Sequence, residues 1–251
     1  MSYFIFDGVL ETNKTFKLGK NEAKHLLKSR RMRPQERFFI QDNSGKRYEA
    51  VLISFGRSEL TFVPEISVEV PIPSSLNLEI LQALTKGKAL DWILQKSTEL
   101  GVERIDFFCG RFSPVSHAVL KKKDPLNRWN RIVLEASKQC GRQFPPEIYL
   151  HDNLKTALGK IKEFENSWLI SPRIKGSISW KDLSNKKNIE MHHRILVGPE
   201  GGFHSDEIKL AIESGMLPVN LGQRIMRSET ATVSAISILQ FLWGDLANKF
   251  V

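Results

Sequence analysis

The chain has 251 residues, 41% of them hydrophobic and 26% charged, which is an ordinary composition for a globular protein with one large domain or two smaller ones. No apolar run approaches the ~20 residues of a membrane-spanning helix, the N-terminus lacks the features of a signal peptide, and the two cysteines have neither disulfide nor zinc-site spacing, so a reducing cytoplasm is the expected location. Lys and Arg total 37 against 28 for Asp and Glu, and the net charge of +9 favours a partner with a phosphate backbone.

The first seventy residues are predicted to form a small β-rich domain. Short runs rich in Phe, Ile, Val and Tyr alternate with turns such as Asn43-Ser44-Gly45. The expected strands occupy residues 1–6, 36–42, 48–55 and 59–65. A short helical pattern begins at Asn21 and ends before Pro34, and the stretch VPIPSSLN near residues 70–77 indicates a linker. We therefore expect a first domain over residues 1–72 and a second over residues 73–251.

In the second domain, predicted strands alternate with predicted helices. Strands are expected over residues 76–84, 102–110, 147–152, 167–172, 194–200 and 218–222. Helices are expected over residues 90–101, 124–142 and 206–215, and from Ser228 to the end of the chain. Alternation of this kind is typical of an α/β domain with a mostly parallel sheet, and a doubly wound sheet is the fold that the residues alone predict.

Three of these helices carry apolar stripes, which predict the faces that they bury. The stripe of the first is Leu90, Ile93, Leu94 and Ser97. The second, with Asp124 as its expected N-cap, has Trp129, Ile132, Val133, Ala136 and Cys140. The stripe of the last is Ala231, Ser234, Ala235, Ile238, Leu239 and Leu242. Its small residues would let a second helix approach closely, so this face is predicted to be either core or an oligomer contact.

Three strand ends are candidate ligand sites, because open parallel sheets bind ligands in the crevice beyond the carboxyl ends of their strands. They are LISP at 169–172, LVGPEGG at 196–202 and NLGQRIMRSETA at 220–231. Gly198, Gly201 and Gly202 would let a ligand approach the backbone. The sequence has no Gly-Lys-Ser/Thr phosphate loop and no G-x-G-x-x-G fingerprint, so a dinucleotide-dependent enzyme is disfavoured. A tight strand-to-helix turn without a ligand is the alternative.

The third strand end brings two cations close to the glycine loop. Arg224 and Arg227 lie between Gly222 and a helix for which Ser228 is the expected N-cap. Glu229 follows in the first turn, where a negative charge suits the helix dipole. A capped helix with solvated arginines would produce the same pattern.

Two of these strand ends, with two segments upstream, match the motifs of a known family. GPEGGF followed by LGQRIMRSETATVSAISILQ resembles the carboxyl half of the bacterial ribosomal RNA small subunit methyltransferase E family. ALTKGKALDWILQKSTELGV and EASKQCGRQFPPEI resemble two further family segments, and the N-terminal part is similar to the family's PUA-like RNA-binding domain. Gln35-Glu36 stands where the family has Gly-Asp, Gln223 where it commonly has Pro, and Ser228 where Thr is usual. The departures at Gln223 and Ser228 do not indicate lost activity.

The resemblance implies a SPOUT methyltransferase fold, with a trefoil knot within about residues 165–240 and S-adenosylmethionine as cofactor. It implies methylation of a uridine at N3 in 16S ribosomal RNA of the small ribosomal subunit, by a homodimer and without a metal ion. The implied cofactor-binding residues are Ile170, Ser171, Gly198, Pro199, Glu200, Gly201, Leu221, Gly222, Ile225, Met226 and Arg227. We hypothesise that Arg227 stabilises negative charge on a uracil oxygen and that Glu200 or Glu229 helps to remove the N3 proton. A Glu200 carboxylate that only holds backbone amides is the alternative.

Basic side chains near the matched segments are candidates for RNA contacts. They are Lys28, Arg30, Arg31 and Arg33 in the first domain and Lys86, Lys88, Arg111 and Arg142 in the second. The lysines at 121–123 are better explained as a solvated face. Two other functions remain open: a SPOUT enzyme that methylates a ribose 2′-hydroxyl of transfer or ribosomal RNA, and an RNA-binding protein that has lost catalysis.

Overall fold

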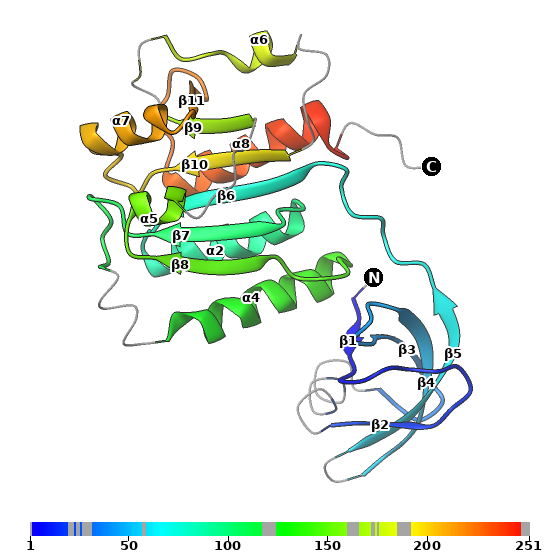
Figure 1. The fold of residues 1–251 in the computed structure, drawn as a ribbon. Coiled ribbons are helices and arrows are strands. Elements are labelled where there is room, and N and C mark those ends of the chain that lie inside the picture. The colour runs from blue at the N-terminus through cyan, green and yellow to red at the C-terminus, as the bar shows by residue number, and fades with distance from the viewer. Residues whose placement is uncertain are drawn as a thin grey trace. The chain divides into compact units, whose positions relative to one another are not determined.

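The structure is a computed structural model, and it describes residues 2–19, 23, 26, 32–56, 59–116, 124–159, 166–171, 174, 176–184 and 192–246. Contacts divide the chain into two compact units (Figure 1). The first comprises Met1–Pro73 together with Ser137–Phe144, and the second comprises Ser74–Ala136 and Pro145–Val251. Among the described residues, no helix is long and apolar enough to cross a membrane. Cys109 and Cys140 are both free thiols.

The first unit contains a five-stranded sheet with the order β1-β3-β4-β5-β2. Its strands are β1 (Phe4–Ile5), β2 (Phe16–Leu18), β3 (Arg37–Gln41), β4 (Arg47–Phe55) and β5 (Leu60–Val68). The predicted β-rich domain is confirmed. Strand β2 was not predicted, because three residues are too few to show an alternating pattern. Most of the predicted helix between Asn21 and Pro34 lies outside the described residues.

The segment Ser137–Phe144 belongs to the first unit through contacts with Tyr3 and Arg47. The Tyr3 hydroxyl donates to the backbone oxygen of Arg142 at 2.5 Å, and a terminal nitrogen of Arg47 donates to the Gly141 oxygen at 3.1 Å. The Arg47 guanidinium also lies 3.9 Å from the centre of the Tyr3 ring. Arg47 is only 4% exposed, and a buried guanidinium is tolerated only where acceptors surround it. The carbonyl groups of residues 141 and 142 therefore help to stabilise this unit.

The second unit contains a six-stranded parallel sheet with the order β11-β9-β10-β6-β7-β8. Its strands are β6 (Asn77–Ala83), β7 (Arg104–Phe108), β8 (Glu147–His151), β9 (Asn166–Ile170), β10 (His192–Val197) and β11 (Leu217–Val219). The helices are α2 (Gly87–Glu99), α4 (Pro125–Cys140), α5 (Leu154–Gly159), α6 (Trp180–Ser184), α7 (Ser205–Glu213) and α8 (Ser228–Trp243). The predicted α/β class with a parallel sheet is confirmed. The knot expected within about residues 165–240 spans some residues outside the described ones and stays a prediction.

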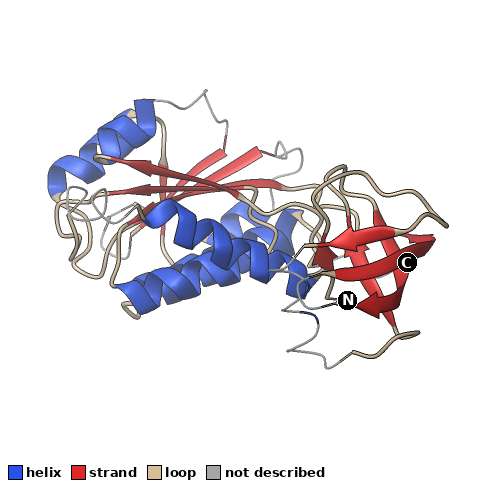
Figure 2. Ribbon diagram, turned by 90° about the horizontal axis from the view of Figure 1, so that it is seen from below, coloured by secondary structure: helices blue, strands red, loops and turns tan. Residues whose placement is uncertain are grey.

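Helices cover both faces of this sheet (Figure 2). The core on one face joins α2, α4 and α8 to strand residues such as Ile80 and Phe107. On the other face α5 and α7 pack against residues such as Leu81 and Phe108. The predicted stripe of α2 is confirmed, because all four of its members are buried: Leu90, Ile93, Leu94 and Ser97.

Three predictions about helix faces and ends are wrong. Cys140 is exposed rather than part of the buried stripe of α4, because the chain from Ser137 onward packs with the first unit. Helix α8 ends at Trp243 with Gly244 as its C-cap, whereas the pattern predicted a helix to the end of the chain. Its buried face is also turned from the predicted stripe, because half of the buried residues are polar and an apolar pattern does not identify them. The buried residues are Ser228, Thr232, Ala235, Ile236, Leu239 and Gln240.

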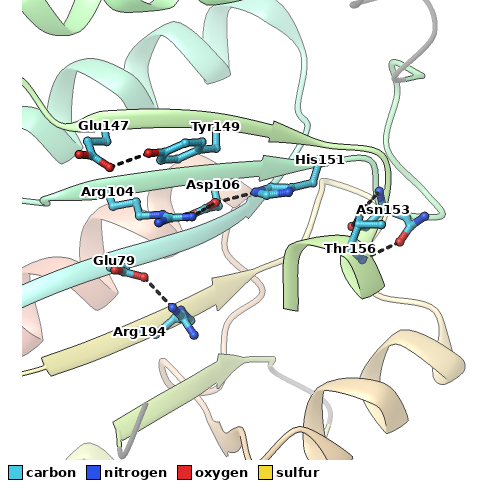
Figure 3. A network of polar contacts seen from close by, with 9 residues as sticks. All are labelled: Glu79, Arg104, Asp106, Glu147, Tyr149, His151, Asn153, Thr156 and Arg194. Carbon is cyan, nitrogen blue, oxygen red and sulfur yellow. Dashed lines mark hydrogen bonds and ion pairs between the residues drawn. The ribbon is translucent and has the colours of Figure 1, made fainter. Parts of the chain in front are cut away.

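Charged side chains share the sheet face of Leu81 and Phe108 and form a buried network (Figure 3). Asp106 on β7 is 1% exposed, accepts two hydrogen bonds from Arg104 at 2.6 and 3.0 Å, and lies 2.6 Å from Nε2 of His151 on β8. On the neighbouring strands, Arg194 donates to Glu79 at 2.6 Å. These pairs connect β10 to β6 and β7 to β8 through their side chains.

Candidate active site

A pocket lies beyond the carboxyl ends of three neighbouring strands, β9, β10 and β11. The strand register places Ile170 beside both Val197 and Val219. The loops that follow the three strands therefore leave the sheet side by side at the carboxyl ends of these strands. The pocket between these loops encloses about 620 Å³, including open solvent at its mouth. The residues that line it are Ile170, Ser171, Val197, Gly198, Pro199, Glu200, Gly202, Phe203, Leu221, Arg224, Ile225, Met226, Ser228 and Ala231.

The lining contains most, but not all, of the residues that were expected to hold a cofactor. Gly201, Gly222 and Arg227 were expected and do not line the pocket. The lining residues that were not expected are Val197, Gly202, Phe203, Arg224, Ser228 and Ala231. The three loops were predictable from the strand ends, but which side of each loop faces the pocket depends on contacts with distant parts of the chain.

Close packing explains two of the loop glycines. A Cβ atom on Gly201 would lie 2.7 Å from Cβ of Phe112, and one on Gly198 would lie 3.0 Å from the Phe203 ring. Gly202 has a φ of +77°, which a residue with a side chain rarely adopts. Gly201 thus has a packing role against Phe112.

A buried hydrogen-bond network joins the glycine loop to α8. The Ser228 hydroxyl donates to the Gly198 oxygen at 2.6 Å and accepts from Nε2 of Gln82 at 3.0 Å. Thr232, one turn further along α8, donates to Oε1 of Gln82 at 2.6 Å. The expectation that Ser228 caps α8 is wrong, because the N-cap is Arg227 and the Ser228 hydroxyl is engaged by a buried carbonyl that needs a donor. A polar Gln82 in an otherwise apolar strand end was the one signal for this network in the sequence.

Glu200 is exposed at the edge of the pocket and is oriented by the start of α2. One of its carboxylate oxygens accepts from the backbone N–H of Lys86 at 3.1 Å, and Lys86 is the N-cap of α2. A carboxylate is favoured there by the positive end of the helix dipole. This contact gives Glu200 the amide-holding role that was the alternative to proton removal, while leaving its side chain in the pocket lining.

The other two predicted catalytic residues lie at the start of α8. Arg227 is the N-cap, with φ −63° and ψ 154°, and makes no side-chain capping bond. Glu229 lies in the first turn of the helix and does not line the pocket. Of the two arginines in this loop, Arg224 is the one that lines the pocket.

The predicted RNA-binding residues fall into three groups. Lys28, Arg30 and Arg31 lie outside the described residues, as do the lysines at 121–123. Arg33 and Arg142 belong to the first unit, where Arg33 is exposed and Nε of Arg142 donates to the Phe144 oxygen at 2.6 Å. Lys86, Lys88 and Arg111 belong to the second unit, and all three are exposed.

Two of these basic residues flank the glycine loop. Lys86 contacts Glu200, and Arg111 lies next to Phe112, which packs on Gly201. A terminal nitrogen of Arg111 is 3.6 Å from Asp206 of α7, so part of its charge is already paired. Across the described parts of the chain, no group of three or more His, Cys, Asp and Glu side chains could hold a metal ion.

Comparison with known families gives two matches that follow the two parts of the chain. Residues 73–240 match the model of an RNA methyltransferase domain, and residues 18–65 match that of an RNA methyltransferase PUA domain. Among curated relatives, the ribosomal RNA small subunit methyltransferase E of Aquifex aeolicus is 33% identical, with 88% of this chain and 92% of the relative covered. The protein of that name from Buchnera aphidicola is 27% identical, with 95% of each covered.

Solved structures resemble the whole chain as well. A methyltransferase from Legionella pneumophila in complex with the cofactor SAM has a TM-score of 0.87 and 28% identity, with 97% of this chain and 98% of that chain covered. A ribosomal RNA small subunit methyltransferase E from Neisseria gonorrhoeae, bound to S-adenosyl methionine, has a TM-score of 0.85 and 30% identity, with 98% and 99% covered.

Proposed function

The chain belongs to the ribosomal RNA small subunit methyltransferase E family, and on this basis we propose that it methylates N3 of a specific uridine in 16S ribosomal RNA. Family membership assigns the S-adenosylmethionine-dependent methylation of small-subunit ribosomal RNA. The proposed part is that the methyl group is transferred to N3 of a uridine. The pocket at the three strand ends is the observation that carries the proposal.

The residues of the pocket fit an adenosyl group. Its lining is mostly apolar with a few polar groups, which is typical of small-molecule sites. Leu221, Ile225 and Met226 supply apolar surface for a flat ring, and the glycine loop supplies backbone hydrogen-bonding groups for its edge. Ile225 is 68% exposed, and binding a ring would cover an apolar side chain that otherwise faces water.

The chemistry requires a proton to leave N3 and negative charge to be stabilised on the uracil ring. When bound, S-adenosylmethionine supplies an activated methyl group. Arg227 stabilises the charge that develops on a uracil oxygen. Glu200 is better placed than Glu229 to assist at N3, because Glu200 lines the pocket and Glu229 does not. The assisting atom is the carboxylate oxygen of Glu200 that does not accept from the Lys86 amide.

Two further properties are part of the proposal. The chain acts as a homodimer through α8, whose partly buried Ala231, Ser234 and Ile238 adjoin Phe241, which is 62% exposed. Burying this apolar face against a second copy would remove it from water. Because the substrate is ribosomal RNA, the reaction takes place in the cytoplasm.

The test of the proposed function is calorimetry with S-adenosylmethionine, followed by transfer of a labelled methyl group to 30S subunits. Binding together with label in 16S RNA, recovered as 3-methyluridine, would support the proposal. Label on a ribose would keep the cofactor site and overturn the target atom. A protein that binds RNA but not S-adenosylmethionine would overturn the enzymatic function.

A further inference from the structure

A second pocket lies between α2 and α4, on their solvent-exposed side. From α2 it is lined by Lys88, Asp91, Trp92 and Gln95, a spacing that puts all four on one helix face. Arg128, Arg131 and Ile132 line it from α4. The pocket encloses about 680 Å³, including open solvent.

The lining of this second pocket combines an open aromatic ring with an excess of positive charge. Trp92 is 43% exposed in the middle of α2, although a large aromatic side chain is usually buried. Arg128 is paired with Asp91. Within the described parts of the chain, Lys88 and Arg131 form no ion pair, so their two charges remain available to an anion.

We propose that this pocket binds an unpaired nucleotide of the RNA substrate, with its base stacked on Trp92 and its phosphate held by Lys88 and Arg131. Aromatic side chains beside cations are the usual means of holding single-stranded nucleic acid, because every base has a face that stacks and every linkage carries a charge. The inference rests on the proposed function and extends it to a second contact with the RNA.

The first turn of α2 connects this pocket to the active site. Lys86, at the start of α2, donates its backbone N–H to Glu200 of the glycine loop. At the helical rise of ~1.5 Å per residue, Trp92 lies roughly 9 Å further along the axis. The bound nucleotide is therefore one that flanks the methylated uridine in the same strand, and it fixes the position of the strand beside the glycine loop.

The charge of the pocket favours RNA over a second copy of the chain. A symmetric contact would bring together two surfaces that each carry an excess of positive charge, and like charges at close range oppose association. RNA brings negative charge to the same surface.

The experiment compares Trp92→Ala with Trp92→Phe, using a 16S RNA fragment and 30S subunits. Trp92→Ala is expected to raise the Kd for the fragment, and the KM for 30S subunits, by roughly 5- to 150-fold, the range that one stacked base contributes. Trp92→Phe keeps a ring and is expected to retain most of the affinity. Both variants should bind S-adenosylmethionine as the wild type does, because Trp92 lies outside the cofactor pocket. Thermal unfolding of both variants shows whether each is folded at the assay temperature.

A matched pair of charge variants tests the phosphate contact. Arg131→Ala is expected to lower the slope of log affinity against log salt by about 0.7, the value for one phosphate contact on a single strand. Lys209→Ala removes an equal charge from α7, where the side chain is 76% exposed, and should leave the slope unchanged.

Two results would overturn the inference. The first is unchanged RNA affinity in Trp92→Ala, and a change in its sedimentation would then make the pocket a contact between proteins. The second is an equal loss of affinity in Trp92→Ala and Trp92→Phe. Failure of the proposed function gives a different result. The wild-type protein would then make no 3-methyluridine, although Trp92→Ala would still bind RNA more weakly than the wild type.

Discussion

Ser228 connects three parts of the candidate site through one hydroxyl group. It holds the glycine loop by donating to Gly198, and it is held by Gln82 of the central strand β6. Ser228, Gln82 and Thr232 are all almost completely buried, so each polar group must find its partner inside the protein. The position of the glycine loop in the cofactor pocket therefore depends on a strand residue 146 positions away in the sequence.

Replacing Ser228 tests this dependence. Ser228→Ala leaves the Gly198 oxygen without its donor and Nε2 of Gln82 without one acceptor, which is expected to cost about 1–3 kcal/mol of stability and to weaken S-adenosylmethionine binding. Ser228→Thr keeps the hydroxyl and serves as the control. Thermal unfolding and calorimetry measure the two effects. A Ser228→Ala protein that matches the wild type in both would contradict a structural role for the hydroxyl.

Arg227 is the residue that we expect to act on the transition state. Arg227→Ala is expected to reduce the single-turnover methylation rate at saturating cofactor by roughly 10²- to 10³-fold, the size of effect seen when one donor to a developing anion is removed. Arg224→Ala is the comparison, because Arg224 lines the pocket and its loss should mainly raise the Kd for S-adenosylmethionine. An unchanged rate in Arg227→Ala would remove that residue from the mechanism.

Strands β7 and β8 are joined by Asp106, which lies between Arg104 and His151 (Figure 3). Asp106→Ala removes the shared acceptor of both side chains in a buried setting and is expected to cost about 3–5 kcal/mol. Glu147→Ala on the same strand pair removes an exposed carboxylate that accepts from Tyr149, and should cost far less. Urea unfolding of both variants measures the difference, and equal costs would contradict the importance of burial.

The spacing of apolar residues predicted the buried face of a helix where the same core covers the whole helix. Helix α2 follows its apolar stripe because its buried apolar residues all enter one core, which α2 shares with α8. Helix α4 departs from its stripe at Cys140, where the covering surface changes to the first unit. Helix α8 buries Ser228, Thr232 and Gln240, so the spacing of its apolar residues could not identify the buried face. The spacing of apolar residues along a helix does not show which distant part of the chain packs against that helix.

The candidate site was predictable to the level of its loops. The carboxyl ends of neighbouring parallel strands lie side by side, so the three strand ends were sufficient to locate the pocket. The roles of individual residues were not predictable, because Gly201 packs on Phe112 and Ser228 pairs with Gln82, both far away in sequence. The second pocket was not predicted either, because its residues come from two helices and the pattern along one helix does not show which helix lies beside it.

The net charge of +9 belongs to the molecule as a whole, and its effect should depend on where the charges lie. Replacing Arg30, Arg31 and Arg33 together by Ala is expected to reduce RNA affinity and to lower its salt slope by about 0.7 for each phosphate that these side chains neutralise. Replacing Lys121, Lys122 and Lys123 by Ala removes the same charge from the run predicted to be solvated. Equal effects of the two triple variants on RNA binding would show that only total charge matters.

The segment Ser137–Phe144 makes the N-terminal unit discontinuous in the sequence. A fragment that stops at Pro73 would lack the carbonyl groups that accept from Tyr3 and Arg47, and would expose a guanidinium that is otherwise 4% exposed. The N-terminal unit is therefore not a transplantable module. We expect that joining this unit to the remaining part of a relative would give a folded protein only where the eight residues from Ser137 to Phe144 are transferred together with it.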